Sequence, residues 1–231
     1  ARRKRLIRAF SPDASVPDDL KYPCVFGIDL EGGTACKPVE MLCSMLELTP
    51  EVVGTSNKIE RMAGLITEMI ENGGCAACIL NTVSEAQELY EKLKDCLSDT
   101  DLILFHSRFT LERRFAIEKA IDRKYGIKRD KRPARGVVIA TQVIEQSLDL
   151  DFDYMVTDLA PIDLLLQRAG RLHRHVVRKF SRVLHVMIPD LLAGSADFGP
   201  SRFVYFPDIL HRTGRLFIDA DVYRTVRVEI P

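Results

Sequence analysis

The sequence predicts an α/β domain in which a mostly parallel, doubly wound sheet carries helices on both faces. Between residues 58 and 190, segments with the apolar spacing of a helix alternate with short runs that are apolar throughout. Runs without polar alternation indicate strands buried on both faces, as in parallel sheets whose strands are joined by helices. The chain has 231 residues, 46% of them hydrophobic, which suffices for one sizeable core.

The predicted elements follow one another at short intervals. A helix is expected over 58–72, where apolar residues recur with helical period until Gly73 ends it. A second helix is expected over 84–97, with Ser84 as its N-cap and Gln87 completing a capping box. The same patterns predict helices at 110–125 and 161–174, and strands at 75–83, 101–106, 136–140, 154–160 and 181–189.

The two ends of the chain fall outside this pattern. Residues 1–57 contain five prolines, and we expect them to form an extended connecting segment with a hairpin near Gly32 and Gly33. The sequence does not decide whether this segment packs on the core or on a neighbouring domain. Residues 191–231 are interpreted as a C-terminal tail that leads toward a further domain.

Composition excludes few functions. Lys plus Arg and Asp plus Glu both number 33, so the net charge is zero and predicts no particular partner. No apolar run approaches the roughly 18 residues of a membrane span, and the basic start lacks the apolar core of a signal peptide. Six irregularly spaced cysteines favour a reducing cytoplasm. The one CxxC pair, Cys75 and Cys78, starts an apolar run and has no second ligand pair, so no metal site is predicted.

The segment QRAGRLHRH concentrates positive charge around a glycine. On a helix of about 100° per residue, Gln167, Arg171 and Arg174 share one narrow stripe, opposite the apolar residues of the same segment. Two guanidiniums this close repel, and a phosphate held between them would relieve the repulsion. The alternative is a solvated helix face, or arginines neutralised by Asp158 and Asp163.

A second polar segment follows the predicted strand at 136–140. Thr141 and Gln142 come directly after that strand, and ligands of doubly wound sheets collect beyond the carboxyl ends of strands. Three aspartates, beginning at Asp149, then alternate as at the start of a calcium loop. The sixth and twelfth positions of such a loop would be tyrosine and alanine instead of glycine and glutamate, so we reject calcium.

Four motifs in order carry a resemblance to a known family. ATQVIEQSLDLDFD followed by APIDLLLQRAGRLHRH resembles motifs V and VI of a superfamily 2 helicase. More narrowly, they resemble the CRISPR-associated superfamily 2 helicase-nuclease of type I systems, whose motifs read much like EQSLDxDFD and QRxGRLHRH. LNTVSEAQELY is similar to that family's motif IV region and LFHSRFTLERR to its HSRF segment, with a weaker echo in VYFPDILHRTGRL. The resemblance covers residues 58 to about 190 and implies the second RecA-like domain of such a protein.

A complete motor of this type needs a P-loop, GxxxxGK[ST], and an acidic DExx motif for magnesium. In this sequence no glycine precedes lysine, no aspartate precedes glutamate, and no histidine precedes aspartate as in the family's nuclease dyad. The resemblance therefore implies half of an ATPase, inactive by itself. ATP and Mg²⁺ would be held mainly by the first RecA-like domain.

The resemblance also implies roles for individual residues. Arg171 and Arg174 match the motif VI arginines that reach the γ-phosphate, and Gln167 would assist them. Asp149 matches the motif V acid near the ribose or the coupling network. The DNA backbone is assigned to residues expected just beyond strand ends, namely Ser107, Arg108, Thr141 and Gln142. Three residues off the arginine stripe are expected to have a local structural role: Arg168, His173 and His175.

The function implied is that of the second motor domain of an ATP-dependent single-stranded-DNA translocase. Such a protein unwinds and degrades foreign DNA in CRISPR interference, an antiviral defence in the prokaryotic cytoplasm. Its implied partners are single-stranded DNA, the first RecA-like and nuclease domains of the same protein, and an RNA-guided surveillance complex, with no membrane. Two alternatives stay open. One is a general superfamily 2 DNA or RNA helicase half, against which EQSLDLDFD argues, and the other is a non-catalytic module that binds DNA or protein.

Overall fold

The computed structural model describes residues 9, 24–29, 33–39, 44–128, 131–145, 149–176, 178, 182–193 and 196–230. They fall into two units, of which the first comprises Ala1–Ser44 and Glu229–Pro231 and the second Met45–Val228. In the first unit, β1 (Cys24–Ile28) and β2 (Thr34–Pro38) pair as an antiparallel hairpin. Gly33 lies in its turn, as expected, whereas Gly32 lies outside the described residues.

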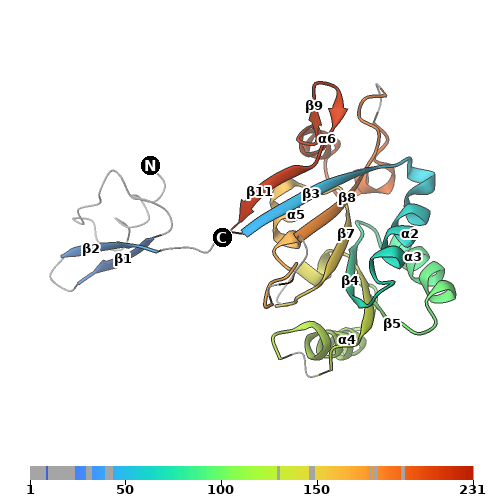
Figure 1. Ribbon diagram of the computed structural model, residues 1–231, viewed down its shortest axis with the longest axis horizontal. Helices are drawn as coiled ribbons and strands as arrows, with labels where there is room; N and C mark the ends of the chain where they lie inside the picture. The colour runs from blue at the N-terminus through green and yellow to red at the C-terminus, as the bar shows by residue number, and fades with distance from the viewer. Residues whose placement is uncertain are drawn as a thin grey trace. The chain divides into compact units, whose positions relative to one another are not determined.

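The second unit is built around a seven-stranded sheet with the order β11-β3-β8-β7-β4-β6-β5 (Figure 1). The neighbours from β3 to β5 all pair in parallel, which confirms the predicted doubly wound α/β class. The strands are β3 (Ser44–Val52), β4 (Gly74–Ile79), β5 (Asp101–Phe105), β6 (Arg135–Ala140), β7 (Tyr154–Asp158), β8 (Arg182–Ile188) and β11 (Val226–Ile230).

Two of these strands lie in segments for which no sheet strand was predicted. β3 contains Pro50, and a proline in a strand pattern argues against a paired strand because it cannot donate to the ladder. β11 lies in the segment 191–231, which also contains α6 (Pro207–Arg215) and the hairpin of β9 (Ile218–Asp219) with β10 (Val222–Tyr223). The sheet domain is therefore larger than the predicted range 58–190.

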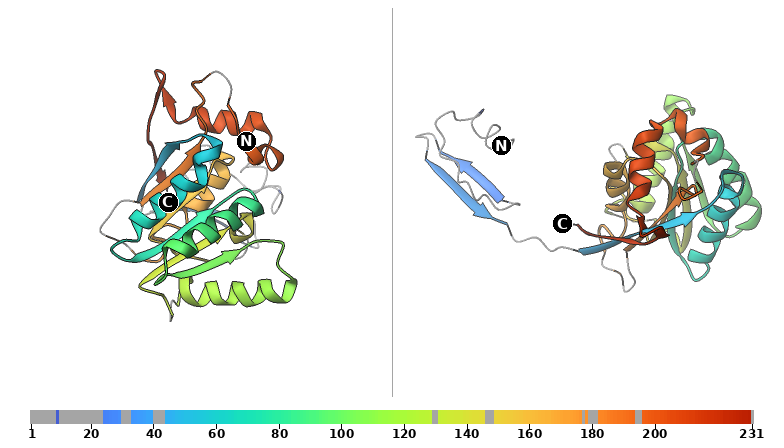
Figure 2. Two further views of the ribbon diagram at one scale, coloured as in Figure 1. Left: turned by 90° about the vertical axis from the view of Figure 1, so that its right-hand side faces the viewer. Right: turned by 90° about the horizontal axis from the view of Figure 1, so that it is seen from above.

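The other helices are α2 (Lys58–Met69), α3 (Val83–Cys96), α4 (Leu111–Tyr125) and α5 (Ile162–Ala169), with 3₁₀ turns η1 (Thr55–Asn57), η2 (Gln142–Glu145) and η3 (Gly199–Phe203). α2 and α3 cover one face of the sheet, and α5 and α6 lie on the other (Figure 2). α4 packs against the edge strand β5. No helix of the described residues is both long and apolar enough to span a bilayer.

The predicted N-cap of α3 was wrong by two residues. The helix begins at Val83, so Thr82 is the N-cap, and its hydroxyl accepts from the Glu85 backbone N–H. Thr82 also donates to the Glu85 carboxylate at 2.7 Å. The cap therefore joins Thr82 and Glu85 instead of Ser84 and Gln87, and the Glu85 carboxylate accepts from the Thr82 hydroxyl where a capping box would use the backbone N–H.

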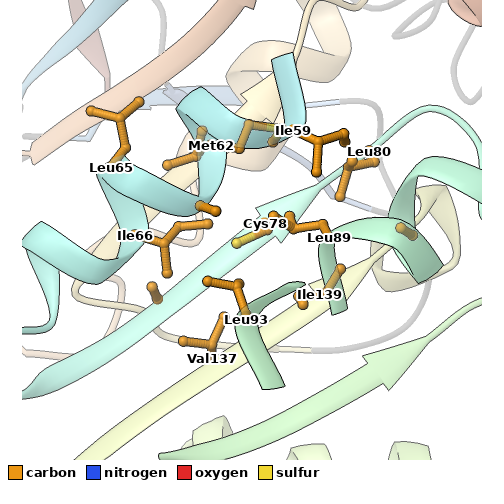
Figure 3. Close-up of a cluster of buried hydrophobic side chains, with 14 of the residues drawn as sticks. Ile59, Met62, Leu65, Ile66, Cys78, Leu80, Leu89, Leu93, Val137 and Ile139 are labelled. Carbon is orange, nitrogen blue, oxygen red and sulfur yellow. The ribbon is translucent and has the colours of Figure 1, made fainter. Parts of the chain in front are cut away.

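An apolar cluster lies between α2, α3 and the sheet (Figure 3). Ile66, Leu89 and Leu93 point from the helices toward Cys78 on β4, and all four are fully buried. Cys75 and Cys78 are free buried thiols, and burial raises the pKa of Cys75 to about 11. The CxxC pair therefore fills the core as neutral thiols and is not a redox site.

The core predicts a clear stability contrast between two leucines on helices. Leu89→Ala should lower the free energy of unfolding by roughly 2–5 kcal/mol, because it removes a fully buried side chain and leaves a cavity. Leu111→Ala on α4 should change it by about 0.5 kcal/mol or less, since Leu111 is exposed. Urea denaturation followed by far-UV circular dichroism measures both. Equal losses in the two variants would contradict this assignment of the core.

Candidate functional site

Helix α5 ends earlier than its sequence pattern predicts. The helix was expected over 161–174 but stops at Ala169, with Gly170 as its C-cap. Beyond it, Leu172 pairs with Phe152 in an isolated parallel bridge, and His173 has a positive φ of 50°. The prediction that Gln167, Arg171 and Arg174 share a stripe of one helix is therefore wrong, because the chain leaves the helix after Gly170 and Leu172 pairs with Phe152.

The four residues predicted for the nucleotide nevertheless lie together, at the end of α5, and we call them the arginine cluster: Asp149, Gln167, Arg171 and Arg174. Arg171 is only 4% exposed, and it donates to the Gln167 carbonyl at 2.9 Å and the Glu145 carbonyl at 2.8 Å. Its Nε atom is buried and has no hydrogen-bond partner among the described residues. Burial, and then the nearby charge of Arg174, lower the pKa of Arg171 from its usual value.

Arg174 differs from Arg171 in being open to solvent. Its Nε atom lies 2.5 Å from the Asp149 carboxylate, and the two side chains are 44% and 43% exposed. The Arg174 backbone N–H donates to Asp151 at 2.7 Å, which fixes the chain below the side chain. The Gln167 side chain is exposed beside them, so its backbone carbonyl is the part that contacts Arg171.

The three alternating aspartates each face arginines, and the apolar residues between them, Leu150 and Phe152, are fully buried. Asp149 pairs with Arg174, Asp151 pairs with Arg178 at 2.9 Å, and Asp153 pairs with Arg132 at 2.7 Å and with Arg178. Within the described residues, no group of three or more possible ligands could hold a metal ion. The alternation therefore reflects an extended segment with one arginine-facing side.

The four residues predicted for the DNA backbone lie at the carboxyl ends of two neighbouring strands, and we call them the strand-end group: Ser107, Arg108, Thr141 and Gln142. Ser107 and Arg108 follow β5 and are exposed. Thr141 follows β6, and its side chain is buried. Gln142 is half-buried and donates to the Asn81 carbonyl at 3.0 Å. The structure thus brings the group to one edge but leaves mainly Ser107 and Arg108 open.

Arg168 is the largest fully buried side chain among the described residues, with no exposed surface. It donates to Glu145 at 2.7 Å, to the Thr157 hydroxyl at 2.7 Å and to the Tyr205 hydroxyl at 3.4 Å. These contacts agree with the local structural role expected of Arg168. The contacts join η2, β7 and the segment before α6. The spacing of residues in motif VI alone could not have indicated these partners.

A buried ion-pair group at the ends of β4 and β7 was not predicted at all. Lys58 lies 2.6 Å from Glu85 and 2.9 Å from Asp158, and Asp158 also accepts from the Asn81 backbone N–H at 2.8 Å. Burial lowers the pKa of Lys58, but the two carboxylates outweigh it and the net shift is upward. Asp158 therefore neutralises Lys58 and not the motif VI arginines, and the three partners are too distant in sequence to show a pattern.

Comparison with known proteins gives matches over the same region. The family model described as CRISPR-associated nuclease/helicase Cas3, C-terminal, matches residues 72–177. A CRISPR-associated nuclease/helicase Cas3 of Streptococcus thermophilus is 43% identical over 120 residues, which are 52% of this chain and 13% of that protein. A crystal structure of T. fusca Cas3-ATP matches with a TM-score of 0.72 and 35% identity, covering 87% of this chain and 26% of that one.

A third match comes from a structure of a CRISPR RNA-guided surveillance complex in a pre-nicking state. One of its chains is 31% identical, with a TM-score of 0.68, and the match covers 88% of this chain and 27% of that chain. This chain therefore spans about a quarter or less of the length of these relatives. The resemblance stated from the motifs is confirmed: this chain matches the C-terminal helicase domain of the CRISPR-associated nuclease/helicase Cas3.

Proposed function

We propose that this chain is the second motor domain of an ATP-dependent single-stranded-DNA translocase that unwinds and degrades foreign DNA in CRISPR interference. The arginine cluster is the observation that supports this most strongly. Arg174 is exposed beside a second guanidinium, that of Arg171, whose Nε atom has no hydrogen-bond partner in the described part of the chain. Guanidiniums suit phosphate oxygens, and a polyphosphate brings more negative charge than one carboxylate.

The two arginines would contribute in different ways. Arg171 is held by two neutral carbonyls and would supply fixed positive potential without moving. Arg174 would exchange Asp149 for the terminal phosphate, because an exposed ion pair contributes about 1 kcal/mol or less. Mg²⁺-ATP would be held mainly by the first RecA-like domain. An arginine from this chain would stabilise the negative charge that develops as the terminal phosphoryl group is transferred. Gln167 would assist from the exposed end of α5.

The strand-end group would grip the DNA backbone. Ser107 and Arg108 offer a hydroxyl and a guanidinium to solvent beyond β5, and Gln142 lies beyond the adjacent strand β6. Contacts of this kind position a strand without reading its sequence, and they weaken as salt rises. Thr141 would act through its position in the backbone, since its side chain is buried.

The proposed partners follow from the matched relatives. A chain similar to this one occurs in a structure of an RNA-guided surveillance complex, so we propose such a complex as the partner that delivers DNA. The first RecA-like and nuclease domains of the same protein would complete the enzyme. The prokaryotic cytoplasm is the proposed location, and the buried Cys75 and Cys78 are free thiols.

The isolated 231-residue chain should hydrolyse no measurable ATP, with or without single-stranded DNA, because the phosphate cradle belongs to the first RecA-like domain. Phosphate release at saturating ATP measures this, and adding the first half of the protein should restore DNA-stimulated turnover. ATP turnover by the purified chain alone would refute the proposal that the ATP site is shared between this chain and the first RecA-like domain. Failure of the two halves to bind each other in gel filtration would explain an inactive mixture.

In the full-length protein, Arg174→Ala should lower the DNA-stimulated kcat by about 10³-fold or more, the usual effect of losing an arginine finger. Arg224→Ala is the matched control, because Arg224 is also exposed and pairs with Asp219 at 2.8 Å. Both variants should keep wild-type affinity for single-stranded DNA. Near-normal turnover of Arg174→Ala would exclude it as a finger. Arg171→Ala is a weaker test, since Arg171 is buried and its loss also disturbs folding.

A further inference from the structure

Two phenylalanines before and at the start of α6 are unusually exposed. Phe203 is 81% and Phe206 77% exposed, the highest values among the large hydrophobic side chains of the described residues. Hydrophobic side chains this open, on a segment with defined structure, indicate a binding surface. They lie in η3 and directly before α6, and neither the arginine cluster nor the strand-end group includes them.

The segment that carries these rings is anchored to the strand ends. Ser201 is buried, and its hydroxyl accepts from the Asn81 side chain at 2.9 Å. Tyr205, between the two phenylalanines, contacts the Arg168 guanidinium at 3.4 Å and hydrogen-bonds to Gln142. Asn81 in turn accepts from Gln142 through its backbone carbonyl. The chain between the two phenylalanines is thus held beside Gln142, a member of the strand-end group.

The chemistry around the rings suits a polyanion with aromatic bases. The Arg202 guanidinium carbon lies 4.8 Å from the Phe203 ring centroid, a cation–π arrangement that places positive charge at the ring. From η3 to the end of α6 the basic side chains Arg202, Arg212 and Arg215 outnumber the single acid Asp208. Proteins that hold single strands combine such positive charge with aromatic rings on which bases stack, whatever the base.

We propose that Phe203 and Phe206 form a base-stacking platform for single-stranded nucleic acid. The proposal rests on the proposed function, because the strand-end group would hold the backbone of the strand whose bases reach these rings. A docked protein is the competing occupant of the same surface. The two differ in a testable way, since stacking needs aromatic rings, whereas a protein interface tolerates leucine in place of phenylalanine.

The experiment measures binding of the full 231-residue chain to two labelled oligonucleotides by fluorescence anisotropy. One is oligo-dT and the other is an abasic oligonucleotide of equal length, which keeps the phosphates but lacks bases. Each is titrated with the wild type, with Phe203→Leu, Phe206→Leu and Phe203→Tyr, and with Phe115→Leu. Phe115 is an exposed phenylalanine on α4 and serves as the matched control. Circular dichroism melting curves verify that each variant is folded.

The proposal expects the wild type to bind oligo-dT more tightly than the abasic strand. Each leucine variant at 203 or 206 should weaken binding to oligo-dT by roughly tenfold and leave binding to the abasic strand unchanged. Phe203→Tyr and Phe115→Leu should bind both strands like the wild type. Arg108→Ala should weaken both strands alike, since it removes a backbone contact.

Two results would overturn the platform, and they separate it from the proposed function. Equal, salt-dependent binding of both oligonucleotides that is unaffected by the leucine variants would remove the platform and leave the backbone contacts intact. In that case, if the leucine variants bound the other domains of the protein with altered affinity, the surface would be a protein-docking surface instead. Binding to neither strand at low salt would refute both the platform and the proposed DNA contacts.

Discussion

The ion pair between Arg168 and Glu145 is the constraint on which the candidate site depends. Arg168 is fully buried, and a buried guanidinium is tolerated only when it is paired and hydrogen-bonded. Glu145 supplies the carboxylate at 2.7 Å, and its backbone carbonyl accepts from Arg171. Glu145 of η2 therefore holds both arginines: its side chain binds Arg168 and its backbone carbonyl binds Arg171.

This arrangement separates two tasks within one short segment. Arg171 has no room to change partners, because it is buried between two carbonyls. Arg174 lies three residues further on, where its backbone is fixed by Asp151 and its side chain pairs with the half-exposed Asp149. A rigid base with one adjustable guanidinium is what a site needs if its anion arrives from a separate domain, since preorganised charge requires little rearrangement when the anion binds.

The sequence predicted the fold class and most helices and strands, because apolar periodicity reports which face of an element is buried. It predicted the arginine cluster through motif spacing, but for a wrong geometric reason, since Gly170 ends α5 before Arg171. Contacts between residues far apart in the chain could not be predicted. Lys58 with Asp158, and Arg168 with Tyr205, join segments whose proximity exists only after the sheet has formed.

The four-residue 3₁₀ turn η2 connects the strand-end group to the arginine cluster. Its first residue, Gln142, contacts Asn81 and Tyr205 at the strand ends, and its last, Glu145, contacts Arg168 and Arg171. The Glu145 end of η2 is held in place, because the buried Arg168 donates to the Glu145 carboxylate. If a strand bound at the proposed site displaced Gln142, only the four residues of η2 would lie between that displacement and the support of Arg171. The proposed nucleic-acid and nucleotide sites are therefore the two ends of one element.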